Sequence, residues 1–234
     1  MSNQNNYYTS TLSAERLKIC YDIAPPRVRQ YLEAELHHVL QRIRPGDTVL
    51  ELGCGYGRLL PALAGRVAII IGIDAAFSSL LMGRETLSTI SHCHLVQMDA
   101  VHLAFRDSTF DTVVCIQNGI SAFHIDQLKL IRESIRVTKP GGLILFSSYS
   151  EKFWQHRLEW FQLQSKAGLL GEIDTERTRN GVIVCKDGFT ATTVGPDQFL
   201  ALTSDLNIDA RILEVDESSV FYEIVPHKQS TSGR

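Results

Sequence analysis

Apolar residues in the first part of the chain recur at the three- and four-residue spacing that is typical of helices. We expect a first helix to begin near Ser13, a good N-cap residue, and to end before Pro25-Pro26, because a residue that precedes proline avoids the helical conformation. A second helix is expected over 27–43, followed by a Pro-Gly pair that stops it. The segment 1–45 is therefore predicted to be helical.

Between residues 48 and 148, short apolar runs alternate with segments of helical pattern. The apolar runs predict strands at 48–52, 67–73, 94–98, 111–116 and 143–148, and the segments between them predict helices at 58–64, 77–90 and 126–137. Strands that are separated by helices form right-handed βαβ units. The pattern therefore predicts an α/β fold with a doubly wound, mainly parallel sheet that is covered on both faces.

The pattern changes after residue 149. We expect a helix over 151–170, a β-hairpin over 181–194 that turns at Asp187-Gly188, a helix from Pro196 to about residue 205, and an antiparallel pair of strands at 210–216 and 219–225. We interpret the chain 1–234 as a single domain, with a core at 46–148, an insertion between strands five and six that extends with its following helix over 150–205, and a final strand pair within 206–227.

Composition and charge limit the class of protein. The chain has 234 residues, of which 44% are hydrophobic and 21% are charged, as in ordinary globular domains, and its net charge of −3 disfavours nonspecific nucleic-acid binding. No apolar run approaches the ~20 residues that cross a bilayer, and because the start is polar we expect no signal peptide. The five cysteines contain no CxxC pair, so we expect reduced thiols and a cytoplasmic protein.

The most informative segment is 51–57, Glu-Leu-Gly-Cys-Gly-Tyr-Gly, which follows a predicted strand and precedes a predicted helix. Glycines at 53, 55 and 57 allow a sharp turn and the close approach of a ligand, but the GxGxG spacing differs from the GxGxxG of dinucleotide binding. The carboxylate of Glu51 would repel a pyrophosphate and attract a cationic group. The loop therefore favours a ligand other than a dinucleotide.

Two further acids stand at predicted strand ends. Asp74 ends the second strand and Asp99 ends the third, and the carboxyl ends of parallel strands line the ligand crevice of a doubly wound sheet. Such acids can accept hydrogen bonds from the hydroxyls of a ribose and from an adenine amino group. Taken one at a time, they could instead be helix N-caps.

These segments resemble the class I S-adenosylmethionine-dependent methyltransferases. The matching segments are VLELGCGYGR (49–58), IGID (71–74), QMDA (97–100), FDTVVCIQN (110–118) and the KPGG turn (139–142), and the first of them departs nowhere from the family pattern. The resemblance covers about 48–148. It implies a seven-stranded sheet whose last strand is antiparallel, and an N-terminal segment that serves as a lid.

The resemblance also implies a cofactor, S-adenosylmethionine, with S-adenosylhomocysteine as its product. Glu51 and the glycine loop would hold the methionine part, Asp74 the ribose, and Asp99 with its neighbour the adenine. The residues expected at the cofactor are Glu51, Gly53, Cys54, Gly55, Gly57, Asp74, Ala75, Asp99, Ala100 and Gln117.

Methyl transfer mainly requires that nucleophile, carbon and sulfur are aligned. Asn118 ends the fourth strand and would face the methyl group. A neutral hydroxyl or amine must also lose a proton, and His124 is the candidate base, although it could simply precede the helix that begins near Asp126. We therefore name His124 and Asn118 as candidate catalytic residues.

The acceptor pocket is expected beyond strand four, under the helical segments that flank the core. The residues named for it are Tyr21, Asn118, Tyr149 and Trp154. Small-molecule sites are largely apolar, so Trp160 and Phe161 could also line it, although all these aromatic residues could equally be ordinary core. We expect no metal site, because the His-Cys-His run at 92–94 lacks the spacing of zinc ligands.

The sequence thus predicts an enzyme that methylates an O, N or S atom of a small molecule. One alternative is a protein of the same fold that binds the cofactor without methyl transfer. Another is a protein or nucleic-acid methyltransferase, which is disfavoured because residues 117–120 read QNGI where base-amino methyltransferases carry an NPPY-type tetrad. We expect no nucleic-acid or membrane partner. The oligomeric state stays open, with a homodimer as one option.

Overall fold

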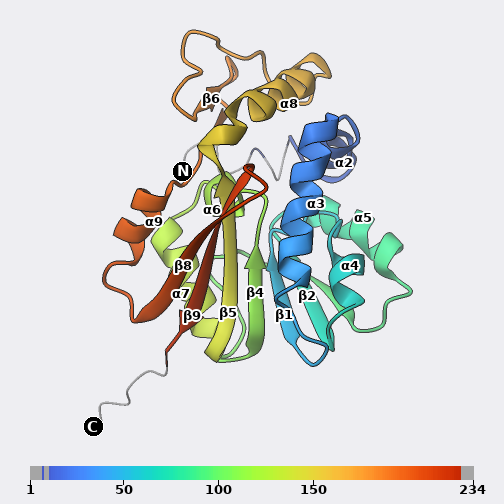
Figure 1. The fold of residues 1–234 in the computed structure, drawn as a ribbon. Helices are drawn as coiled ribbons and strands as arrows, with labels where there is room; N and C mark the ends of the chain where they lie inside the picture. Colours follow the sequence, from blue (N-terminus) through green and yellow to red (C-terminus); the bar gives the residue numbers. More distant parts are fainter. Residues whose placement is uncertain (1–6, 8–10, 228–234) are drawn as a thin grey trace.

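A seven-stranded sheet forms the centre of the computed structural model, which describes Tyr7 and residues 11–227 (Figure 1). The strand order is β3-β2-β1-β4-β5-β9-β8. The strands are β1 (Thr48–Leu52), β2 (Ile69–Asp74), β3 (Cys93–Gln97), β4 (Phe110–Cys115), β5 (Thr138–Tyr149), β8 (Ile208–Val215) and β9 (Ser219–Pro226). The first five run parallel, and β9 is antiparallel to both of its neighbours, which confirms the predicted sheet with an antiparallel last strand.

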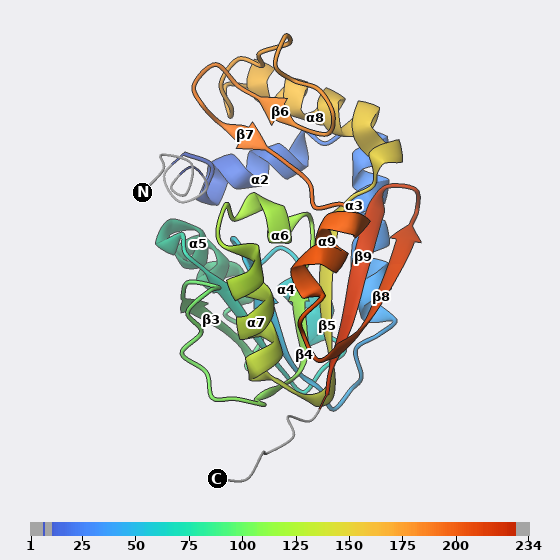
Figure 2. The same cartoon turned by 90° about the vertical axis from the view of Figure 1, so that its left-hand side faces the viewer.

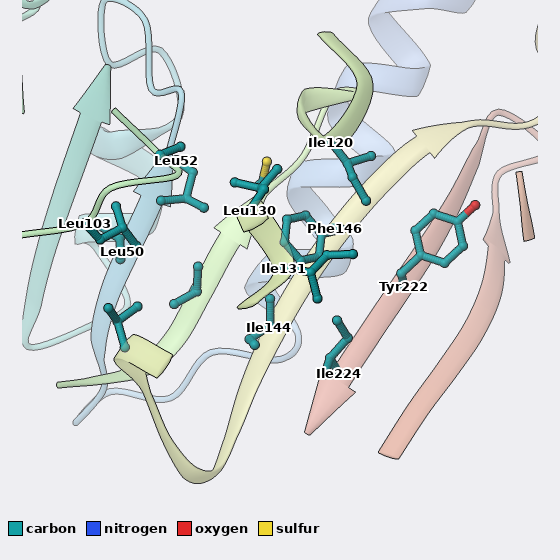
Figure 3. Packing of buried hydrophobic residues seen from close by; sticks show 14 of the residues in the cluster. Leu50, Leu52, Leu103, Ile120, Leu130, Ile131, Ile144, Phe146, Tyr222 and Ile224 are labelled. Carbon is teal, nitrogen blue, oxygen red and sulfur yellow. The ribbon is translucent and has the colours of Figure 1, made fainter. Parts of the chain in front are cut away.

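Helices cover both faces of this sheet. One face packs against α3 (Pro26–Leu40), α4 (Leu60–Ala64) and α5 (Phe77–Leu87), and the other packs against α6 (Gly119–Ala122), α7 (Gln127–Val137) and α9 (Pro196–Thr203). Successive residues of a strand point to opposite faces, so apolar strands supply two cores at once. Figure 3 shows the core on the α7 side, where Leu50, Phe146 and Tyr222 from three strands meet Leu130 and Ile131 of α7.

A lid lies over the carboxyl edge of the parallel strands (Figure 2). We use this name for α2 (Ala14–Asp22), α8 (Trp154–Lys166) and the hairpin of β6 (Ile183–Val184) and β7 (Thr190–Ala191). An apolar cluster joins its parts, and the indole N–H of Trp160 donates to the carbonyl of Cys20 at 2.8 Å. The N-terminal helix and the late insertion, far apart in the sequence, thus form one structure.

Several predicted boundaries were wrong. The helix predicted over 151–170 begins with a 3₁₀ turn, η2 (Glu151–Phe153), and α8 ends at residue 166, two residues before Gly168, whose positive φ of 67° stops it. The segment 139–142 was predicted as a turn before a strand, but it belongs to β5, with an irregular register opposite Phe110. The short helix α6 was not predicted. The remaining strands and helices lie within about three residues of their predicted ends.

Two further features bear on the predictions. All five cysteines are free thiols. Within residues 11–227, none of the helices has the length and apolar character that a membrane crossing requires.

Candidate functional site

A cavity of about 430 Å³ lies between the carboxyl edge of the sheet and the lid. The ends of β1, β2 and β4, the turn after β3, the helix α6 and the lid helices α2 and α8 all contribute to its wall. Its lining residues are Leu12, Leu17, Cys20, Tyr21, Gly53, Ile73, Asp74, Ala75, Ser79, Met98, Asp99, Ala100, Ile116, Gln117, Gly119, Ala122, Phe123, Ile125, Tyr149, Trp160, Phe161 and Gln164. Most of the residues predicted at the cofactor therefore meet at one place.

The glycine loop bends back over the end of β2. Gly53, Gly55 and Gly57 all have positive φ, a conformation that other residues adopt only at a cost. The N–H groups of Gly53 and Cys54 donate to the carbonyl of Ile73, which ties the loop to β2. A Cβ at residue 53 would meet the ring of Phe123, which would have to move to make room for it.

The acids at the strand ends accept backbone hydrogen bonds and retain capacity for more. Asp74 accepts from the N–H of Gly55 at 2.8 Å and from that of Ala76 at 2.7 Å, while burial raises the pKa of its carboxyl group. Asp99 is exposed, and its carboxylate lies 2.9 Å from Nδ1 of His102. Neither acid is a helix N-cap, since Ala76 holds that position in α5 and the next helix after Asp99 begins at Gly119. Each carboxylate can accept additional hydrogen bonds from a ligand.

A smaller cavity of about 40 Å³ adjoins the first and shares the walls formed by Tyr21, Gly53 and Gln117. Within the described residues, it is bordered by buried polar atoms without a partner: Oε2 of Glu51, Nε and Nη2 of Arg58, and Nε2 of Gln117. Burial raises the pKa of Glu51 to about 7, while the guanidinium of Arg58 acts in the opposite direction. Unpartnered buried groups are costly, which indicates a polar ligand at this end. A carboxylate, a guanidinium and an amide suit the amino-acid end of the cofactor.

The turn after β4 is strained and held from several sides. Gln117 and Asn118 both have positive φ, at 57° and 64°. The N–H of Gln117 donates at 2.7 Å to Glu35 of α3, a fully buried carboxylate, and the side chain of Gln117 accepts from the hydroxyl of Tyr21. The amide of Asn118 joins Ser148 of β5 to the hairpin. Such strain persists only where the surroundings fix it, and it is common at functional sites.

Four of the predicted site residues lie outside the lining of both cavities: Gly57, Asn118, His124 and Trp154. The side-chain amide of Asn118 accepts from the hydroxyl of Ser148 and donates to the carbonyl of Thr192. Burial lowers the pKa of His124, with a hydrogen bond to the Thr190 backbone acting in the opposite direction, so this residue lies against the hairpin. Trp154 packs into the apolar cluster of the lid. These four residues line neither cavity, and their predicted roles at the cofactor and acceptor stay predictions.

Other site residues were not found by sequence reasoning. Arg58 ends the segment 49–58 that resembles the family, but the resemblance gave it no role at the cofactor. No sequence pattern near Phe123 or Gln164 indicates that they line a cavity. Glu35 lies 82 residues before the Gln117 amide that it holds, so only the fold brings the two together. For the described residues, no group of three His, Cys, Asp or Glu side chains is arranged to hold a metal ion. His92 belongs to the His-Cys-His run at 92–94, and its Nε2 lies 2.9 Å from the carbonyl oxygen of Ala64.

Comparison with known proteins shows which domain this chain is similar to. Residues 49–142 match the family model described as a methyltransferase domain. A malonyl-[acyl-carrier protein] O-methyltransferase from Marinomonas sp. (strain MWYL1) is 32% identical over 127 residues, 53% of this chain and 46% of the relative. A demethylmenaquinone methyltransferase from Staphylococcus aureus (strain JH9) is 30% identical over 130 residues, 51% of this chain and 53% of the relative. The chain thus spans about half the length of the curated relatives it matches.

A solved structure extends the likeness in fold beyond that domain. A SAM-dependent methyltransferase from Methanosarcina mazei superposes with a TM-score of 0.60 at 18% identity, over 81% of this chain and 96% of the other. The domain match over 49–142 and the strand order of the sheet both indicate a methyltransferase-like fold, with the acids and the glycine loop at one edge of the sheet. Residues 49–142 are therefore similar to methyltransferase domains, and the sheet shares the fold of a SAM-dependent methyltransferase of known structure.

Proposed function

We propose that this protein transfers the methyl group of S-adenosylmethionine to a small molecule held in the 430 Å³ cavity. One observation carries the proposal: the cavity joins the acids and the glycine loop at the sheet edge directly to an aromatic wall on the lid. A cofactor and an acceptor can therefore share one enclosed space.

The residues of the chain would hold the cofactor along the sheet edge. Asp74 would accept hydrogen bonds from the ribose hydroxyls, and Asp99 and Ala100 lie where the adenine would bind. Glu51 and Arg58 would receive the ammonium and carboxylate groups of the methionine part. This arrangement would satisfy the buried polar atoms that lack a partner in the protein itself.

The bound cofactor supplies a methyl group on a positively charged sulfur. On transfer, a lone pair of the acceptor forms the new bond to carbon, the carbon–sulfur pair stays with sulfur, and any acceptor proton is released to the bulk solvent as the product leaves. The role of the protein is to align the acceptor with the methyl group, and this alignment alone can lower the activation barrier considerably. The lid helices and Phe123 would exclude water from the reacting atoms.

The names of the relatives support a transferase but indicate acceptors of very different chemistry, a malonyl-carrier protein and a demethylmenaquinone. The acceptor must therefore be inferred from this cavity. Methylation of nucleic acid is disfavoured by the net charge of −3. The oligomeric state stays a prediction.

Calorimetry with S-adenosylhomocysteine and NAD tests the proposal. We expect S-adenosylhomocysteine to bind and NAD not to bind, because Glu51 stands where a pyrophosphate would be repelled. Glu51→Gln should weaken S-adenosylhomocysteine binding by about 10- to 100-fold, the equivalent of one charged hydrogen bond. Binding of NAD alone would contradict the proposal. Binding of the cofactor with no transfer of its labelled methyl group to any member of an acceptor panel would favour the non-enzymatic alternative.

A further inference from the structure

The charged side chains that line the large cavity are confined to one end. Across the described residues, Asp74 and Asp99 are the charged members of its wall, and both lie at the ends of β2 and β3. The rest of the wall is apolar, aromatic or neutral and polar. Residues 1–13, which precede the lid helix, carry no charged side chain either.

Two arginines of the lid are engaged by the protein itself. Arg16 of α2 donates to the carbonyls of Thr11, Gly168 and Leu169. Arg157 of α8 is only 1% exposed, and its guanidinium donates to the carbonyl of Gly181. These two cations hold the parts of the lid together. Neither lines the cavity, although the guanidinium of Arg157 lies over the rings of Tyr149 and Phe161.

The polar groups at the lid side of the cavity are uncharged. Burial raises the pKa of both Tyr21 and Tyr149, so each remains a neutral phenol near pH 7. The indole N–H of Trp160 is already donated to a backbone carbonyl, so Trp160 offers the cavity an apolar ring. Gln164, which is 4% exposed, contributes an amide. The side chains of this wall can hydrogen-bond a neutral group, and none of them carries a charge that could pair with an ionised acceptor.

We propose that the acceptor is an uncharged, planar and mainly apolar molecule, such as a neutral phenol or enol, and that carboxylates and ammonium compounds are excluded. This inference rests on the proposed function and gives its substrate class. Trp160, Phe161 and Phe123 supply faces and edges for a ring, which aromatic groups prefer. A buried charge without a partner is strongly disfavoured, so the same wall rejects ionised acceptors.

Binding to the protein saturated with S-adenosylhomocysteine tests the inference without relying on turnover. The probes are 4-butylphenol, 4-butylbenzoate and 4-butylbenzylammonium at pH 7.5, which have similar shape and differ in charge. We expect the phenol to bind, and each charged probe to bind at least about 100-fold more weakly. Binding of either charged probe within about 10-fold of the phenol would overturn the inference, as would failure of the phenol to bind up to its solubility limit.

A change in the wall provides a second measurement. Gln164→Lys places a cation at the acceptor end, and Gln164→Met is its uncharged control. We expect the lysine variant to bind 4-butylbenzoate at least about 10-fold more tightly than the methionine variant does, with no such gain for 4-butylbenzylammonium. Equal benzoate affinities in two folded variants would contradict the inference. If S-adenosylhomocysteine itself does not bind, the proposed function fails, and that result is seen before any acceptor probe is added.

Discussion

At the scale of single residues, the buried carboxylate of Glu35 does more for the site than its distant place in the sequence suggests. It accepts from the N–H of Gln117 at 2.7 Å and from the hydroxyl of Ser219 at 2.6 Å. It therefore links α3 and β9 to a turn whose two left-handed residues cost of order 1–3 kcal/mol each. Gln117 in turn borders both cavities. Glu35 is thus a positioning residue for the cofactor end of the site.

Replacing Glu35 should reveal both its electrostatic cost and its positioning role. Burial raises its pKa to about 7 from 4.5, so the folded state holds a proton that the unfolded state releases. Stability should therefore fall as the pH rises from about 4.5 through 7. Glu35→Gln removes this loss. The free energy of unfolding of the variant, relative to that of the wild type, should therefore rise by on the order of 2–3 kcal/mol between pH 5 and pH 8.5. Denaturant titrations at both pH values measure this.

The positioning role has a different readout. Glu35→Gln keeps an acceptor for the N–H of Gln117 and should retain the affinity for S-adenosylhomocysteine, whereas Glu35→Leu should lower it by about 10-fold as the turn relaxes. If folded Glu35→Leu binds S-adenosylhomocysteine as the wild type does, then Glu35 serves stability alone.

The acids at the strand ends should contribute unequally to cofactor affinity. Asp74 is largely buried and would serve two ribose hydroxyls, while the side chain of Asp99 is 53% exposed and competes with water. Asp74→Asn should weaken S-adenosylhomocysteine binding by about 10- to 100-fold in calorimetry, and Asp99→Asn by less. Near-wild-type affinity in both variants would show that these acids only organise their turns.

Local sequence reasoning could bring together residues at strand ends, but it could not find residues whose contacts depend on the fold. Glu51, Asp74 and Asp99 could be found because parallel strands bring their carboxyl ends to one edge. Glu35 could not, because its partners are Gln117 and Ser219, which lie on other elements.

At the scale of elements, the aromatic helix α8 shows what a pattern can and cannot predict. Its composition predicted a helix near the acceptor, but not which aromatic side chains reach the cavity. Trp160 and Phe161 line the cavity, while Trp154, about two turns before Phe161, packs within the lid. The packing of α2 against α8, through Cys20 and Trp160, determines which of these side chains face the cavity. This contact joins segments that are far apart in the sequence, so no local sequence pattern predicts it.

Two matched substitutions in α8 separate these roles. Phe161→Leu should weaken the binding of 4-butylphenol to the protein saturated with S-adenosylhomocysteine by about 3- to 10-fold, because the leucine offers the probe no ring face. Trp154→Leu should leave that affinity unchanged while it lowers the melting temperature, since it leaves a void in the lid cluster. Equal effects of the two variants on probe binding would place the acceptor elsewhere.

At the scale of the whole molecule, the sheet and the lid were predictable to different degrees. Alternating strands and helices were enough for a parallel core, and the family resemblance supplied the antiparallel last strand. The lid was expected only as separate segments, because its closure depends on contacts between residues more than a hundred positions apart, such as Arg16 with Gly168. The cavity exists because both parts are in place.

This construction predicts how a ligand should affect the molecule as a whole. One wall of the cavity belongs to the sheet edge at residues 53, 73–75 and 98–100, and the opposite wall belongs to α2 and α8. S-adenosylhomocysteine should therefore slow amide hydrogen exchange in both walls, and a complementary acceptor probe should add protection mainly in α2 and α8. Hydrogen-exchange mass spectrometry measures this, with β8 as an internal reference, because it lies at the far edge of the sheet. Protection confined to the sheet edge, even with the acceptor probe present, would show that the lid helices are not part of the binding site.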